Sequence, residues 1–132
     1  MNRVALSSLF VLSVLLGSAA LAQQAGLSIR SITLAKGWED GAAVDAGTSF
    51  RSSDRIFVIV RVSNPDAAET EVRVSVEQVD GSARQGITLQ IPARRGYRTL
   101  ARFTGRPAGS YRAVVRNAAG EEIGSAEFTV TE

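Results

Sequence analysis

Apolar and polar residues alternate along most of the chain after residue 26, which is the pattern of strands with one buried face. Residues 70–79 show it most plainly, because Val72, Val74 and Val76 fall on one face and polar side chains fall on the other. The same period of two predicts further strands at residues 86–91, 96–103, 111–117 and 122–130. In the strand at 96–103, the face that carries Tyr97 and Phe103 is expected to be the buried one.

Three segments near the start of this region depart from simple alternation. In residues 55–63, apolar side chains occupy both the odd and the even positions, so both faces of the strand are apolar. This pattern predicts a central strand with both faces covered. Residues 27–35 alternate imperfectly and are expected to form a first strand at a sheet edge. Residues 36–47 hold three glycines and the only tryptophan and are expected to be a loop. With no helical period in these segments, the sequence predicts an all-β, two-sheet sandwich of about seven antiparallel strands.

The first 22 residues have the organisation of a removable export signal. Arg3 supplies the positive start, residues 4–16 are almost uninterruptedly apolar, and Ala20-Leu21-Ala22 is a small-x-small cleavage site. Because a membrane-spanning helix needs roughly 20 apolar residues, this run is too short to be a permanent anchor. We therefore expect a signal peptide over residues 1–22, a single sandwich domain over residues 23–132 with no membrane span, and a periplasmic or secreted location.

Two missing residue types restrict the chemistry. The chain of 132 residues contains no cysteine, so a cysteine-linked lipid anchor and disulfides are excluded. It contains no histidine either, so Ser-His and Cys-His pairs and histidine or thiolate metal sites cannot form. Clustered acids at Glu39, Asp40 and Asp45 leave a calcium site conceivable, although solvated loop charges are the simpler interpretation. We expect no catalytic activity, no cofactor and no metal.

The distribution of charge is the sharpest feature. Eight arginines and no acid lie between residues 84 and 116. Guanidinium groups that converge on one face would suit phosphate or carboxylate groups of a partner. The alternative is that they form cross-strand ion pairs with Glu71, Glu77 and Glu127. Trp38 either caps the core or stands exposed as a contact residue. The candidate binding surface consists of Trp38, Arg94, Arg95, Arg98, Arg102, Arg106, Arg112 and Arg116.

Residues 107–115 read Pro-Ala-Gly-Ser-Tyr-Arg-Ala-Val-Val and are followed by Gly120, Gly124 and the terminal apolar pair Phe128 and Val130. This segment resembles the closing hairpin of the immunoglobulin-like and fibronectin-III-like domains of bacterial periplasmic proteins. The resemblance implies that the hydroxyl of Tyr111 pins a corner of the sandwich. It also implies a binding, adaptor or assembly role, which is the usual role of such domains.

Three hypotheses about function follow. The first is an exported, non-catalytic interaction domain of the bacterial cell envelope that binds a protein partner. The second is binding of a polyanion, lipopolysaccharide or nucleic acid, by the arginine-bearing strands. The third is a small protease inhibitor that presents a rigid loop.

Overall fold

The computed structural model describes residues 26–80 and 84–132. The predicted signal peptide and its cleavage site lie outside the described residues. Within the described part of the chain, no helix is long and apolar enough to cross a membrane.

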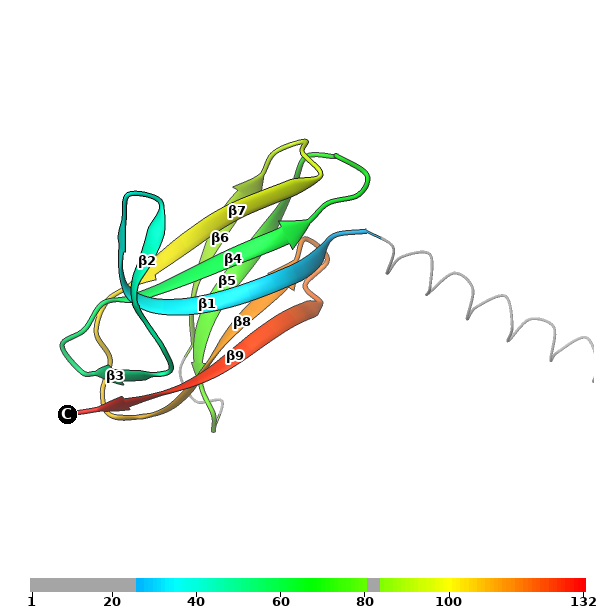
Figure 1. Ribbon diagram of the computed structural model, residues 1–132. Coiled ribbons are helices and arrows are strands. Elements are labelled where there is room, and N and C mark those ends of the chain that lie inside the picture. The colour runs from blue at the N-terminus through cyan, green and yellow to red at the C-terminus, as the bar shows by residue number, and fades with distance from the viewer. Residues whose placement is uncertain (1–25, 81–83) are drawn as a thin grey trace, which may run out of the picture.

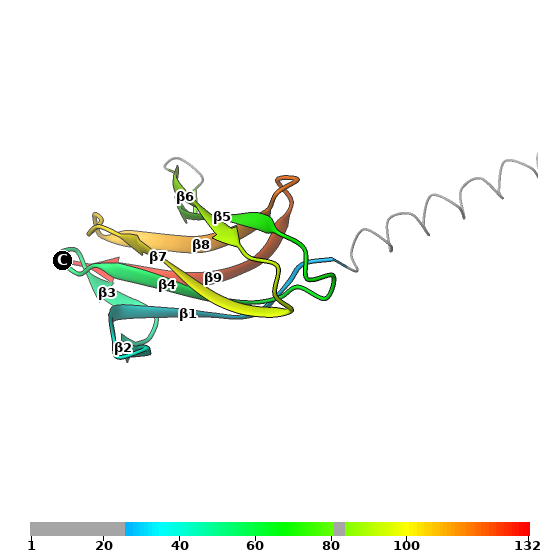
Figure 2. The ribbon, with the colours of Figure 1, turned by 90° about the horizontal axis from the view of Figure 1, so that it is seen from above.

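Nine strands form within these residues and pack as two layers (Figures 1 and 2). They are β1 (Ser28–Glu39), β2 (Ala42–Ala46), β3 (Ser49–Arg51), β4 (Ile56–Ser63), β5 (Thr70–Gln78), β6 (Arg84–Ile91), β7 (Gly96–Phe103), β8 (Gly109–Asn117) and β9 (Glu122–Thr131). Sheet A has the strand order β2-β1-β4-β7, and sheet B has the order β3-β9-β8-β5-β6. The predicted two-sheet sandwich is confirmed, with β2 and β3 added to the seven predicted strands. One short pair, β3 with β9, is parallel.

The central strand of sheet A is β4, which pairs with β1 on one side and β7 on the other. Ile56, Val58 and Val60 point into the sandwich and are fully buried, and Ile59 on the opposite face is only 4% exposed. Both faces of β4 are therefore covered, as its apolar sequence predicts. The buried face of β7 is also the predicted one, since Phe103 is buried and Tyr97 packs against the core.

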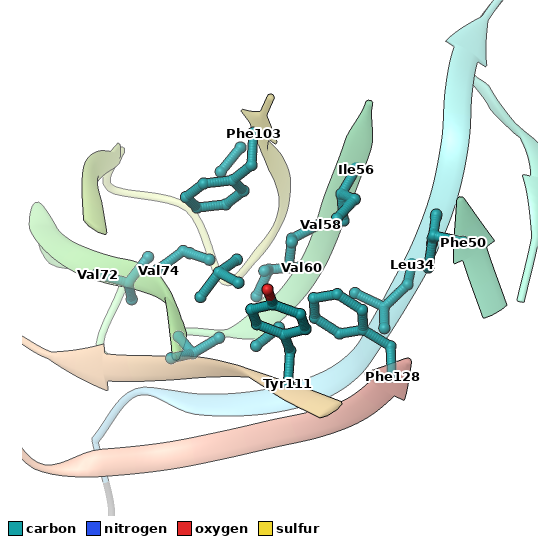
Figure 3. Close-up of a cluster of buried hydrophobic side chains, with 14 of the residues drawn as sticks. Leu34, Phe50, Ile56, Val58, Val60, Val72, Val74, Phe103, Tyr111 and Phe128 are labelled. Carbon is teal, nitrogen blue, oxygen red and sulfur yellow. The ribbon is translucent and has the colours of Figure 1, made fainter. Parts of the chain in front are cut away.

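An aromatic cluster closes the core at the start of β8 (Figure 3). The ring of Tyr111 stacks on Phe128 with centroids 5.5 Å apart, and Phe128 meets Phe50 edge to face at 5.6 Å. The buried Tyr111 hydroxyl donates a 2.7 Å hydrogen bond to the carbonyl oxygen of Pro107. This local bond fixes the entry of β8 and confirms the predicted tyrosine corner.

The prediction of a loop over residues 36–47 is wrong. Strand β1 continues to Glu39 and returns as β2 through Asp40 and Gly41, whose φ angles are 51° and 76°. Two consecutive positive φ angles define the tight hairpin turn that Asp-Gly favours. Strand β1 consequently lies between β4 and β2 instead of at an edge, although β2 covers only its last part, Ala35 to Glu39.

Candidate binding surface

Arginines of sheet A gather on its outer side, which faces away from sheet B. In the register of β4 with β7, Arg61 lies directly opposite Arg98, and Phe57 lies opposite Arg102. On β4, Arg61 alternates with Val60 and Val62, which point into the core. On β7, Arg102 lies between the buried Ala101 and Phe103, and Arg98 has the same parity as Arg102. All three arginines therefore project outward together. Among the described residues, none of the three forms an ion pair.

A β-bulge in β1 adds a fourth arginine. Ile29 pairs with Val62 and Ser31 pairs with Arg61, so Arg30 is an extra residue without a partner on β4. Because a bulge of this kind places two successive residues opposite one, Arg30 and Ser31 both lie beside Arg61 on the outer side. The bulge also explains the imperfect alternation of the segment, since Ile29 and Ile32 both remain directed at Gly124 in sheet B.

Trp38 belongs to this side of the sandwich. The guanidinium carbon of Arg98 lies 4.8 Å from the centroid of the indole ring, which is cation–π geometry. Figure 2 shows β2, the second strand of the hairpin, on the side of sheet A that faces away from sheet B. The turn of the hairpin approaches the same side chain, because a Cβ added to Gly41 would lie 3.9 Å from Arg98 Nη2. Trp38 is half-buried and lies outside the core cluster, so it does not cap the core.

We call the outward side chains of Arg30, Arg61, Arg98, Arg102 and Trp38 the basic face. It unites three of the predicted candidates, Trp38, Arg98 and Arg102, with two arginines that the sequence analysis missed. Arg61 could have been found, because it is the single charged residue inside an otherwise apolar central strand. Arg30 could not, because its direction depends on a bulge that alternation alone does not reveal.

On the outer side of sheet B, the arginines of β8 are paired with acids. Arg116 Nη1 lies 2.7 Å from Glu77 Oε2 and 3.1 Å from Ser75 Oγ, and Arg112 Nη2 lies 2.9 Å from Glu122 Oε2. The predicted cross-strand pairing is thus confirmed for Glu77. For Arg112 the partner is Glu122, even though Glu127 lies directly opposite in register.

The three remaining candidates lie in connecting segments. Arg94 and Arg95 are exposed in the turn between β6 and β7, next to the start of the basic face. The buried Asn64 fixes this turn, because its backbone N–H donates to Arg95 O at 2.7 Å and its side-chain amide donates to Pro92 O at 3.4 Å. Arg106 lies elsewhere, with its guanidinium carbon 5.7 Å from the Phe103 ring centroid, and burial lowers the pKa of its side chain.

The acids considered for calcium do not assemble into a site. In residues 26–80 and 84–132, no group of three acidic side chains, including Glu39, Asp40 and Asp45, is close enough to hold a metal ion. Glu39 and Asp40 follow each other at the end of the β1–β2 hairpin, whereas Asp45 lies farther along β2.

Neither a family model nor a curated protein matches this chain. Solved structures do match. The alkylpurine DNA glycosylase AlkC of Pseudomonas fluorescens, bound to DNA containing an abasic site analogue, is similar over 80% of this chain, with a TM-score of 0.58 and 15% identity. A β-glucosidase of Listeria innocua in complex with glucose is similar over 80%, with a TM-score of 0.52 and 13% identity. This chain spans only 30% and 16% of those two proteins.

An immunoglobulin-like protein from Pseudomonas aeruginosa matches along nearly its whole length. The similarity covers 79% of this chain and 95% of that one, with a TM-score of 0.50 and 14% identity. At such identities the three likenesses concern the fold alone. The likeness to the immunoglobulin-like protein confirms that the described part of the chain has an immunoglobulin-like fold.

Proposed function

We propose that the protein is an exported, non-catalytic interaction domain that binds an acidic surface of a partner protein through its basic face. The observation that carries this proposal is that four arginines on the outer side of sheet A, one of them stacked on Trp38, form no ion pair with the described residues, while the arginines of β8 on sheet B are paired. Arginine and tryptophan are the residue types that most often dominate binding energy at protein interfaces.

The composition of the face favours a protein partner. Phe57 and Leu100, both partly exposed, lie between the arginines in the registers of β4 and β7. Apolar surface of this kind is useful against a protein and adds little against a phosphate backbone. The absence of histidine and cysteine from the whole chain supports a role without catalysis.

The test is capture of a partner from an envelope extract of the cells that produce the protein. We expect a stoichiometric partner with the unaltered protein and loss of that partner when Arg98→Gln and Arg102→Gln are combined. The control combines Arg55→Gln and Arg73→Gln, which removes the same charge from exposed positions outside the basic face. Equal capture by both double variants would refute the assignment of the surface.

The proposed export rests on the sequence of residues 1–22. N-terminal sequencing of the protein recovered from the envelope or the medium should begin at Gln23. Recovery of uncleaved chain from the membrane would contradict it.

Polyanion binding is a second candidate, because the same unpaired arginines could neutralise phosphates. One protein of similar fold, the DNA glycosylase, was solved bound to DNA. This candidate predicts affinity for DNA, heparin or lipopolysaccharide that falls with salt, with a slope of about −0.9 for each phosphate contacted on duplex DNA. Binding that does not respond to salt would remove it. The protease-inhibitor hypothesis stays a prediction.

A further inference from the structure

A small hollow opens on sheet A where β1, β4 and β7 lie side by side. Its volume is about 180 Å³, and it is lined by Arg30, Arg61, Val62, Gly96, Tyr97 and Arg98. Each of the three adjacent strands contributes one arginine, and none of the lining residues that the structure describes is acidic. The described lining of the hollow therefore combines three positive charges with no negative charge.

Two features of the backbone bring these charges together. The strand register sets Arg61 directly opposite Arg98, and the bulge between Ile29 and Ser31 turns Arg30 toward the same place. Like charges directly opposite each other on neighbouring strands repel and destabilise a sheet. Since none of the three arginines has an ion-pair partner among the described residues, an anion bound in the hollow would relieve this repulsion.

We propose that Arg30, Arg61 and Arg98 form a binding site for a phosphoryl group. A phosphomonoester carries a charge of about −1.5 to −2 and three terminal oxygens, which matches three guanidinium groups better than a carboxylate with one charge and two oxygens. The volume equals that of about six water molecules at roughly 30 Å³ each, so the recess has room for such a group.

Part of the site is already ordered before a ligand arrives. Stacking on Trp38 at 4.8 Å restricts the Arg98 side chain. The turn that precedes Gly96 is held by Asn64, whose backbone N–H donates to Arg95 O and whose side chain donates to Pro92 O at 3.4 Å. Because less rotamer freedom is then lost on binding, the site is better suited to an anion than three freely moving arginines would be.

The test is an NMR titration of the purified protein with inorganic phosphate, at ionic strength held constant with sodium chloride. We expect saturable shifts of the Nε–H signals of the three arginines and of the Trp38 indole, with a dissociation constant on the order of 1 mM. Arg61→Gln should weaken phosphate binding by about tenfold or more. Arg61→Lys keeps the positive charge but loses the two parallel N–H donors of the guanidinium, and it should weaken binding less.

Arg55→Gln is the matched control. It removes the same charge from an exposed arginine just before the opposite end of β4, and it should leave the phosphate affinity unchanged. The site would be refuted by equal, non-saturating shifts with phosphate and acetate. It would also be refuted by an Arg61→Gln variant, shown to be folded by its amide spectrum, that binds as the unaltered protein does.

A parallel titration with glycerol phosphate identifies the source of the group. Tighter binding of the ester supports a phosphoryl group attached to a larger molecule, and tighter binding of inorganic phosphate supports the free ion. This inference deepens the second candidate function, because it assigns the arginines that would bind a phosphoryl group, and it does not depend on the proposed protein partner. Loss of partner capture in the Arg98 and Arg102 variant with no phosphate binding would refute the phosphoryl site alone, and the reverse pair of results would refute the protein partner alone.

Discussion

On the outer side of sheet B, Arg116 lies 2.7 Å from Glu77 and 3.1 Å from Ser75. On the outer side of sheet A, Arg98 lies opposite Arg61, and neither forms an ion pair with another described residue. The two faces belong to one sandwich and present similar numbers of arginines. On sheet B, the outward-facing Val114 lies between the paired Arg112 and Arg116 on β8 and is fully buried. On sheet A, the arginines remain exposed.

This difference shows how the same residue type can be structural on one face and available for binding on the other. A guanidinium that is paired with carboxylates of its own sheet can form few hydrogen bonds to a partner protein, because its N–H donors and its charge are already satisfied. A run of arginines in a sequence therefore identifies a binding surface only after the acids on neighbouring strands have been placed. Four predictions test the contrast, from the largest expected effect to the smallest.

Removing the acid of the sheet B network should have the largest effect. Glu77 is 7% exposed and accepts from both Arg116 and Ser75. We expect Glu77→Gln to lower the free energy of unfolding by about 2 kcal/mol, because the Arg116 guanidinium stays partly buried beside a neutral amide. Glu71→Gln, on the same strand but exposed, is the control and should change stability by less than about 0.5 kcal/mol. Urea denaturation measures both. Similar values for the two variants would contradict the structural role of the pair.

Removing a charge from sheet A should have the opposite sign. Arg61→Gln relieves the repulsion across to Arg98 and should stabilise the protein by about 0.2–1 kcal/mol in phosphate-free buffer at low salt. The gain should vanish near 1 M salt, where charges are screened within about 3 Å. Arg116→Gln, measured alongside it, should destabilise at both salt concentrations. If both variants lost stability, the two faces would not differ as described.

The contact of Trp38 with Arg98 should contribute a free energy of similar or smaller size. At an exposed site a cation–π pair contributes about 0.5–1 kcal/mol, and the 4.8 Å separation falls within its range. A double-mutant cycle with Trp38→Phe and Arg98→Gln should return a coupling free energy near the lower limit, since phenylalanine keeps part of the interaction. Because Trp38 is the only tryptophan, its fluorescence in the Arg98→Gln variant also reports on the basic face alone. A coupling free energy of zero would mean that the contact between Trp38 and Arg98 does not stabilise the folded protein.

Much of the fold could be predicted because its signals are local. Period-two alternation assigned the buried faces of β5 and β7, and the hydrogen bond from Tyr111 to Pro107 spans only four residues. The hairpin of β1 and β2 was missed for a specific reason: its Asp-Gly turn lies among other glycines, and the short β2 segment reads as small and flexible. The glycine-rich composition of this segment led to the prediction of a loop, although Asp-Gly is also the sequence of a tight hairpin turn.

The candidate site depends on information that is not local. Strand order and register decide which arginines share a face. A shift of the register by one residue would turn every outward side chain of the strand inward. The bulge at Arg30 and the choice of Glu122 over Glu127 as the partner of Arg112 are both of this kind. Trp38 and Arg98 are 60 positions apart, and only the pairing of β1, β4 and β7 brings them together.

The smallest effect should appear at the one ion pair that reaches sheet A within the described residues, between Lys36 and Asp54 at 3.5 Å. A hydrogen bond from the Arg51 backbone N–H is the main cause that lowers the pKa of Asp54 below its ordinary value of 3.8; desolvation opposes it, and the nearby charge of Lys36 lowers the pKa further. A lowered pKa means that the ionised carboxylate stabilises the folded state above the unfolded pKa, and that this contribution is lost as the pH falls through the folded value. Asp54→Asn should therefore be less stable than the unaltered protein near neutral pH, and the difference should shrink below pH 3.8. Asp66→Asn, an exposed loop change, is the control for the removal of a negative charge. A difference that persists unchanged to pH 2 would assign the effect of Asp54→Asn to altered turn geometry and leave sheet A with no ion pair that matters to its stability.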